Sequence, residues 1–167
     1  MSSPEKPPWA SMSDKAKGEW VEVVFMAKVG ALGLSISKPH GDNEQFDFIV
    51  CDRAGKPVRV QVKSAWTQTS LGYRIQHRRF GDGRPLGYDV LVAYIPPLDA
   101  WYVIPVSELP HSYITHLWPH SRRPSRSKWE PYRNAWHILS GDPDDDTRSL
   151  GLTIHAAADD GKSSKLP

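Results

Sequence analysis

The chain has 167 residues, 39% of them hydrophobic and 24% charged, and a formal net charge of +2, which is an ordinary composition for one globular domain with a substantial core. No apolar run is long enough to cross a membrane, and the opening MSSPEKPPWASMS lacks the apolar core of a signal peptide. Cys51 is the only cysteine, which excludes an internal disulfide framework and leads us to expect a cytoplasmic protein.

An amphipathic helix is predicted over residues 15–32, with Asp14 as its N-cap and Gly33 at its end. Glu22 falls inside the apolar arc of this helix, where a carboxylate is costly unless a metal or a cation pairs with it. Glu19 lies at the edge of the arc and is expected on the surface. The arc itself consists of Val21, Phe25, Met26, Val29 and Leu32.

Three short strands are expected next, at residues 34–38 (LSISK), 46–51 (FDFIVC) and 58–63 (VRVQVK). The last two form a hairpin, because Asp52 and Gly55 have the positions that a type I turn ending in a left-handed residue requires. The predicted loop is therefore Arg53, Ala54 and Gly55.

The register of this hairpin brings polar side chains together. If Asp52 faces Lys56 across the loop, Asp47 lies opposite Gln61. Lys63 follows one pair further along the same face, while alternation sends the valines of the second strand to the other face. A carboxylate, an amide and an ammonium gathered in this way suit a divalent metal beside an anion. The alternative from the hairpin alone is a polar face that meets water.

Further strands are expected at residues 73–77, 88–95 and 101–104, and the nearly continuous apolar character of 88–95 is typical of a strand covered on both faces. One helix followed by several strands indicates an α/β domain with a mixed central sheet flanked by helices. A short helical pattern at 129–139 spaces Trp129, Tyr132 and Trp136 by three and four residues. This spacing favours packing on the core, with nucleic-acid stacking as the alternative.

Positive charge is concentrated locally. Residues 53–84 contain eight Lys or Arg and one acid, a net charge of +7, and residues 111–140 sum to +4. Such a distribution fits the approach of a polyanion such as DNA, although a solvated basic surface has the same composition. The predicted DNA-contacting residues are Arg59, Arg74, Arg78, Arg79 and Arg84.

The composition also predicts the domain boundaries. Residues 1–12 are rich in Ser and Pro and are expected to form a disordered lead, and residues 13–140 form the domain. Residues 141–167 are expected to form an acidic, disordered tail in which the aspartates of 142–146 meet solvent.

The order Glu22, Asp47, Gln61, Lys63 resembles the PD-(D/E)XK nuclease superfamily. KGEWVE at 17–22 matches a helical K-G-x-x-x-E pattern, followed by FDFIV, VRVQVKSAW and YDVLVAYIPPLDAWYVIPVSEL. These segments are most similar to bacterial group I intron-associated homing endonucleases, and more distantly to archaeal Holliday-junction resolvases. The resemblance covers about residues 15–110, with an echo in KWEPYRNAWHIL. Gln61 departs from the usual acid, but the similar homing endonucleases also carry Gln-x-Lys.

The resemblance implies a restriction-endonuclease-like fold and a Mg²⁺-dependent endonuclease acting on double-stranded DNA. The catalytic residues would be Glu22, Asp47, Gln61 and Lys63. Asp47, the carbonyls of Gln61 and Val62, and Glu22 would hold the metal, with one or two ions possible. Cutting both strands implies a homo-oligomer, a dimer or a tetramer. The alternatives are a DNA-binding module without catalysis and a junction or repair nuclease.

Overall fold

The computed structural model describes residues 8–41, 44–77, 87–110 and 112–146. Helix α1 (Asp14–Ala31) begins one residue earlier than predicted, because Ser13 is the N-cap. Ser13 has the extended backbone that a cap needs, and its Oγ accepts a 3.2 Å hydrogen bond from the backbone N–H of Ala16. The helix ends as expected, since Gly33 adopts a left-handed φ of +72°. No helix in the described part of the chain has the length and apolarity that a membrane crossing requires.

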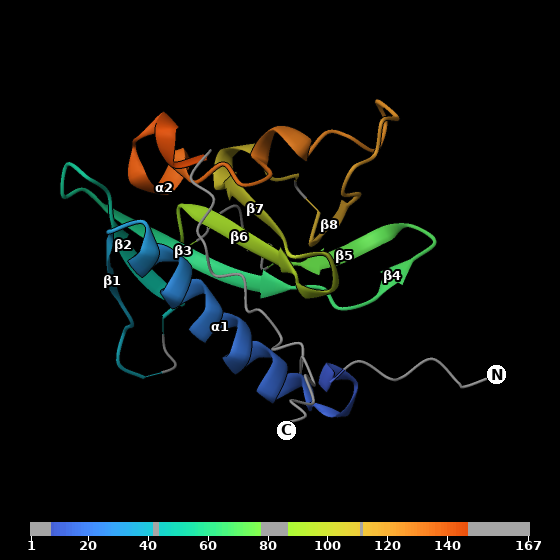
Figure 1. Cartoon of the computed structure of the whole chain (residues 1–167), viewed down its shortest axis with the longest axis horizontal. Helices are drawn as coiled ribbons and strands as arrows, with labels where there is room; N and C mark the ends of the chain where they lie inside the picture. The colour runs from blue at the N-terminus through green and yellow to red at the C-terminus, as the bar shows by residue number, and fades with distance from the viewer. Residues whose placement is uncertain (1–7, 42–43, 78–86, 111, 147–167) are drawn as a thin grey trace, which may run out of the picture.

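The central sheet has five strands in the order β1 (Ser35–Ser37), β2 (Phe48–Cys51), β3 (Pro57–Ser64), β6 (Val90–Ile95) and β7 (Ala100–Pro105) (Figure 1). β3 and β6 run parallel, and the other neighbouring pairs are antiparallel. The short connection η2 (Pro96–Leu98) joins β6 to β7. Every residue of β6 is buried, as its apolar sequence predicted.

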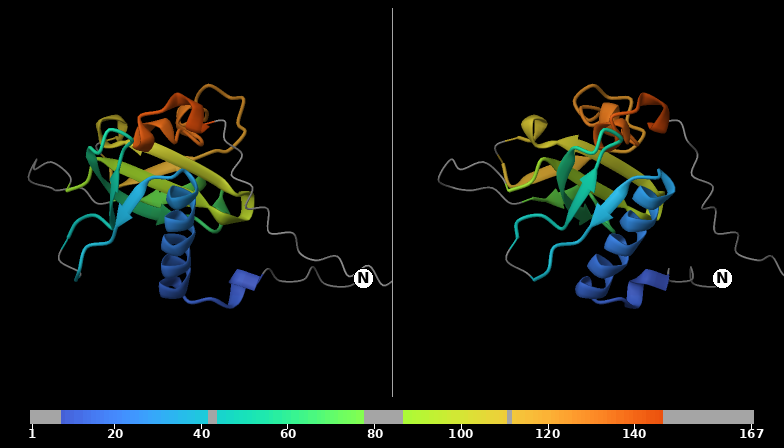
Figure 2. Two further views of the ribbon diagram at one scale, coloured as in Figure 1. Left: turned by 60° about the vertical axis from the view of Figure 1, so that its left-hand side comes forward. Right: turned by 90° about the vertical axis from the view of Figure 1, so that its left-hand side faces the viewer.

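Helix α1 lies along one face of this sheet (Figures 1 and 2). Phe25 of α1 packs 5.4 Å from Phe48 and 6.4 Å from Trp101, measured between ring centroids. Val60 and Val62 of β3 belong to the same core cluster, so alternation places the valines of β3 toward α1 as expected. The predicted apolar arc of the helix therefore packs into this core cluster.

A second, three-stranded sheet covers the other face. It consists of β4 (Gln68–Thr69), β5 (Gly72–Gln76) and β8 (Ile114–Leu117). The expected strand at 73–77 is present as β5, but it pairs with β8, which the sequence pattern did not predict. Tyr73, Ile75 and Leu117 from this sheet pack on Leu91 and Tyr102 of the central sheet.

The segment expected as a helix at 129–139 is instead divided into η4 (Glu130–Tyr132) and the short helix α2 (His137–Ser140). Between them Asn134 takes a φ of +53° and its N–H donates to the Trp101 carbonyl oxygen at 2.9 Å. Pairing with the edge strand β7 therefore outweighs helix continuation. Trp129 and Trp136 are both buried, which confirms that they pack on the core, and Tyr132 is partly buried.

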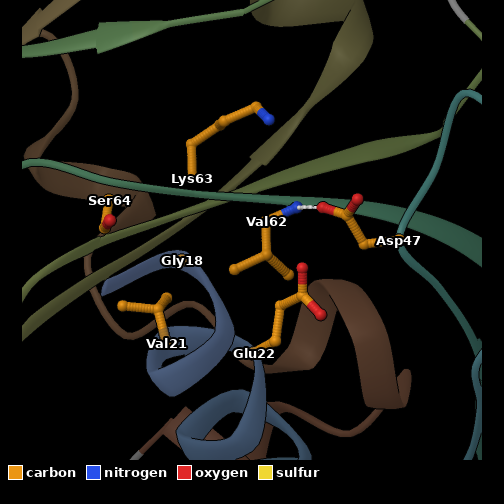
Figure 3. A pocket seen from close by; sticks show the side chains of 7 residues that line it. All are labelled: Gly18, Val21, Glu22, Asp47, Val62, Lys63 and Ser64. Carbon is orange, nitrogen blue, oxygen red and sulfur yellow. Dashed lines mark hydrogen bonds between the residues drawn. The ribbon is translucent and has the colours of Figure 1, made fainter. Parts of the chain in front are cut away.

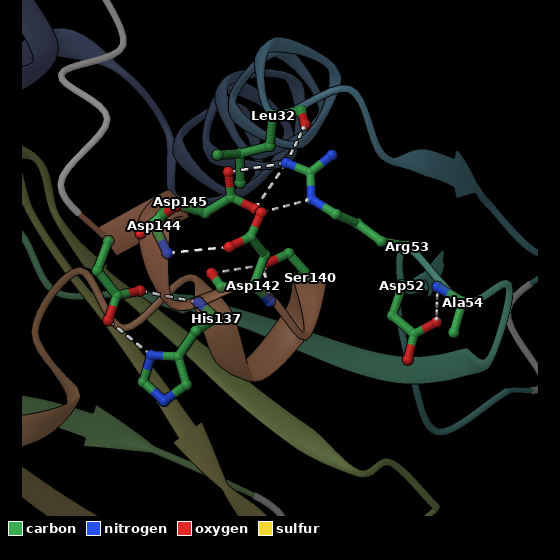
Figure 4. Close-up of polar contacts among 10 residues, drawn as sticks. Leu32, Asp52, Arg53, Ala54, His137, Ser140, Asp142, Asp144 and Asp145 are labelled. Atoms are coloured by element: carbon green, nitrogen blue, oxygen red, sulfur yellow. Dashed lines mark hydrogen bonds and ion pairs between the residues drawn. The ribbon is translucent and has the colours of Figure 1, made fainter.

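Residues 141–146, expected to begin a disordered tail, belong to the folded part. They include η5 (Pro143–Asp146), and Asp145 is fully buried. The guanidinium of Arg53, at the tip of the β2–β3 hairpin, lies 2.8 Å from Asp145 and 3.3 Å from Asp142 (Figure 4). It also donates to the carbonyl oxygen of Leu32 at 3.2 Å. This ion pair explains why an aspartate-rich segment can pack on the domain.

The predicted lead also contains structure. The short helical turn η1 (Pro8–Ser11) lies beside the first turn of α1 (Figure 2). A similar turn, η3 (Val106–Glu108), follows β7. The Trp9 ring is 5.9 Å from that of Trp66, between centroids. Residues 1–7 of the lead and 147–167 of the tail lie outside the described residues.

Candidate active site

The β2–β3 hairpin has the predicted register. Phe48 pairs with Val60 and Cys51 with Pro57, which places Asp47 level with Gln61. In the turn, the N–H of Asp52 donates to the Lys56 carbonyl oxygen at 2.9 Å, and Gly55 has a φ of +81°. The three-residue loop expected from Asp52 and Gly55 is thus confirmed.

Asp47 immediately precedes β2 and is held by β3. Its Oδ2 accepts a 2.7 Å hydrogen bond from the backbone N–H of Val62 and a second bond from the side-chain amide of Gln61. Burial raises the pKa of Asp47 above its ordinary value, and the Val62 N–H, Lys63 and Gln61 oppose this shift. The carboxylate is therefore oriented by a neighbouring backbone and sits in a site that disfavours its charge.

A pocket of about 220 Å³ lies between α1 and the end of β3. Figure 3 shows the carboxylates of Glu22 and Asp47 on neighbouring walls of this pocket, with the amine of Lys63 extending above Val62. Three of the four predicted catalytic residues thus line one cavity although they come from three elements. The complete lining is Gly18, Val21, Glu22, Asp47, Val62, Lys63 and Ser64.

Glu22 has a partner that the sequence analysis missed. The Nζ of Lys38 lies 2.6 Å from Glu22 Oε2, and this hydrogen bond raises the pKa of Lys38. Lys38 directly follows β1 and belongs to no recognisable motif, so only the pairing of β1 with β2 reveals its position. Glu19, expected on the surface, is exposed there beside Lys15.

Gln61 is buried directly behind Asp47 and does not line the pocket. Its amide nitrogen faces Asp47, because an N–H donor complements a carboxylate oxygen. Val62 likewise meets Asp47 through its N–H. A metal-ligand role for the carbonyl oxygens of Gln61 and Val62 stays a prediction. Both residues serve here as donors that orient the carboxylate.

The predicted DNA-contacting arginines have different surroundings. Arg59 forms two side-chain hydrogen bonds with Asp89, of 2.8 and 3.1 Å, and this guanidinium lowers the pKa of Asp89. Arg74 is exposed on β5, opposite His116. Arg78, Arg79 and Arg84 lie outside the described residues.

In the basic stretch before α2, cationic side chains lie against aromatic rings. The Arg126 guanidinium stacks on Trp118 at 4.0 Å, and the Lys128 amine lies 4.5 Å from the centroid of Trp129. Arg122 and Arg123 are exposed. Trp129 is thus a core residue whose ring also supports a surface cation.

The comparisons with known proteins agree with this geometry. The family model described as PD-(D/E)XK endonuclease matches residues 12–139. A solved structure titled as that of a bacterial homing endonuclease, I-Ssp6803I, is 30% identical, with a TM-score of 0.66, and the match covers 79% of this chain and 94% of that one. No curated protein matches. The central sheet and helix α1 therefore have a restriction-endonuclease-like arrangement, and the chain belongs to the PD-(D/E)XK endonuclease family.

Proposed function

We propose that this chain is a Mg²⁺-dependent endonuclease that hydrolyses phosphodiester bonds in double-stranded DNA, in the manner of intron-encoded homing endonucleases. The observation that carries the proposal is the shared pocket of Glu22, Asp47 and Lys63 in a member of an endonuclease family. Phosphodiesters are anionic and repel hydroxide, so hydrolysis needs positive charge beside the nucleophile.

The donor atoms of the pocket fit Mg²⁺. Both hydrogen bonds to Asp47 end on Oδ2, and the Lys38 bond to Glu22 ends on Oε2, which leaves one oxygen of each carboxylate for a metal. Mg²⁺ prefers such oxygen ligands and keeps several waters, so few protein ligands are enough. Among the described residues no three His, Cys, Asp or Glu side chains gather into a larger metal-binding group. The side-chain carbonyl oxygen of Gln61 would join the metal ligands only if the side-chain amide were flipped by about 180°.

The chain's own residues then have distinct roles. Asp47 would hold the metal, and Glu22 would reach it directly or through water. Bound Mg²⁺ supplies a Lewis acid for the scissile phosphate and offsets charge on the departing oxygen. Lys63 would orient the attacking water and take part in its deprotonation. The backbone N–H of Val62 and the side-chain amide of Gln61 keep Asp47 in place.

The DNA would be held by basic side chains around the site. Arg74 is available on β5, and Arg78, Arg79 and Arg84 follow it in the sequence. Arg59 would have to exchange Asp89 for a phosphate. Cleavage of both strands requires two active sites, so we propose a dimer or a tetramer.

Plasmid nicking with Mg²⁺ tests the proposal. We expect Asp47→Ala and Lys63→Ala to lower the rate at least about 100-fold, because the first removes the proposed metal ligand and the second removes the cation beside the attacking water. Glu22→Ala should also impair cleavage, whereas Glu19→Ala, one turn earlier on the same helix and exposed, should cleave normally. Equal nicking by the wild type, Asp47→Ala and Lys63→Ala would refute the site.

A second candidate is a DNA-binding module on a nuclease scaffold. Gln61 favours it, since a neutral amide replaces a charged ligand and faces Asp47 as a donor. Such a protein would retard DNA on a gel and leave the duplex intact at all Mg²⁺ concentrations. Nicking that is lost in Asp47→Ala excludes this candidate.

A further inference from the structure

Lys38 directly follows β1, the edge strand of the central sheet, whereas Lys63 lies on β3 in the middle of that sheet. Strand β1 pairs with β2 so that Ser37 lies beside Ile49. The chain therefore brings Lys38 next to Phe48, and its Nζ lies 5.8 Å from the centre of the Phe48 ring. Asp47 is the residue before Phe48, so this placement sets a second ammonium close to the proposed metal-binding carboxylate.

The contact with Glu22 has the geometry of a strong ion pair. The Nζ–Oε2 distance is 2.6 Å, and the side chains of Lys38 and Glu22 are 58% and 26% exposed. Glu22 lines the pocket, whereas Lys38 is 58% exposed and is not among the lining residues. An ammonium thus neutralises this carboxylate from outside the cavity.

The charges of the site then balance. Glu22 and Asp47 carry two negative charges, Lys38 and Lys63 carry two positive ones, and Gln61 is neutral. One divalent cation at Asp47 leaves the site suitable for an anionic phosphate. A second divalent cation would need Glu22 as its ligand, and would have to lie beside the ammonium that already pairs with it.

We propose that Lys38 is a positioning residue that acts as a fixed counter-cation of Glu22. As a result, the site holds one divalent cation, at Asp47. This inference rests on the proposed function. Its three N–H donors allow it to keep Glu22 and still meet a phosphate oxygen. Lys38 would take over part of the charge compensation that a second metal ion supplies in two-metal nucleases.

Calorimetric titration of the full chain with MnCl₂, without DNA, tests this proposal by binding rather than by activity. We expect one Mn²⁺ per chain in the wild type. In Lys38→Met, Glu22 is released and Mn²⁺ should bind on the order of tenfold more tightly, or a second ion should bind, because a unit positive charge a few ångströms away has been removed. The tightening should disappear in Lys38→Met combined with Glu22→Gln.

Two controls separate this effect from a change in overall charge. Lys15→Met removes the same charge from the exposed pair with Glu19 and should bind Mn²⁺ as the wild type does. Lys38→Arg keeps the charge and should also match the wild type. Two Mn²⁺ ions in the wild type, or equal affinity and stoichiometry in the wild type and Lys38→Met, would overturn the inference. Failure of the proposed function looks different: either no Mn²⁺ binds to the wild type, or Asp47→Ala binds it equally well.

Discussion

The backbone N–H of Val62 donates a 2.7 Å hydrogen bond to Oδ2 of Asp47, so a main-chain group of one strand orients the acidic side chain that precedes another. No side-chain substitution at position 62 removes this donor, except proline. The orientation of Asp47 therefore depends on the register of the β2–β3 hairpin rather than on the identity of residue 62.

Asp47 is expected to reduce the stability of the metal-free protein. Burial raises the pKa of Asp47 in the folded chain, so stability is lower above that pKa and rises as the pH falls through it toward the unfolded value. Asp47→Asn should therefore raise the free energy of unfolding at pH 7 by about 1 kcal/mol, although it removes the proposed metal ligand. Urea unfolding in EDTA measures this. Glu19→Gln is the control and should change little, and a destabilised Asp47→Asn would contradict the prediction.

His77 should make the protein sensitive to mild acid. Its side chain is buried, its Nε2 lies 3.1 Å from the Thr115 hydroxyl, and burial lowers its pKa below the ordinary value of 6.5. The unfolded chain binds a proton at position 77 below about pH 6.5 while the folded chain resists it. Stability is thus fully present above pH 6.5 and falls as the pH drops toward the folded-state pKa.

The variant that checks this is His77→Gln, which cannot titrate. Between pH 7 and pH 5.5 the wild type should lose on the order of 1 kcal/mol more unfolding free energy than the variant does. Parallel curves for the two proteins would show that His77 does not control the acid response.

Gly72 should tolerate no side chain. Its φ is +94°, and a Cβ would lie 2.7 Å from both the Leu117 carbonyl oxygen and the Trp118 ring. Gly72→Ala should therefore cost about 2–4 kcal/mol. Gly30→Ala is the matched control, because that glycine is helical with open space around it and should gain about 0.5–1 kcal/mol. Thermal unfolding distinguishes them, and equal melting temperatures would contradict the close contact with Trp118.

Two arginines with acidic partners should differ in their effect on stability. Arg53 faces the fully buried Asp145, whereas Arg59 and Asp89 are both about half exposed. Arg53→Met removes a cation beside a buried carboxylate and should cost about 2–4 kcal/mol. Arg59→Met should cost less than about 1 kcal/mol. Urea unfolding at pH 7 compares them, and similar losses would show that burial of Asp145 does not set the strength of its pair.

Local sequence patterns were enough to predict helix α1 and the β2–β3 hairpin. The turn residues Asp52 and Gly55 set the register that brings Asp47 to Gln61, and the apolar arc of α1 directs Glu22 toward the sheet. Both features are properties of short segments, which is why periodicity and turn chemistry predict them.

Features that depend on distant segments were missed. Strand β8 forms because β5 offers it a partner, and Lys38 reaches Glu22 only because β1 pairs with β2. From the sequence alone, residues 142–146 are predicted to form a solvated acidic tail, because no neighbouring residue indicates that Arg53 lies opposite them. Such contacts join residues as far apart as 92 positions, beyond the range of any local pattern.

The contact of Arg53 with η5 has a consequence for biosynthesis. The hairpin that presents Asp47 ends at Ser64, but Asp142 and Asp145 leave the ribosome only after the other described strands and α2 have been translated. The tip of the hairpin then gains its acidic partners. Nascent chains interrupted before Asp142 lack a contact that braces the hairpin, so the surroundings of Asp47 are completed only after strands far along the chain have been made.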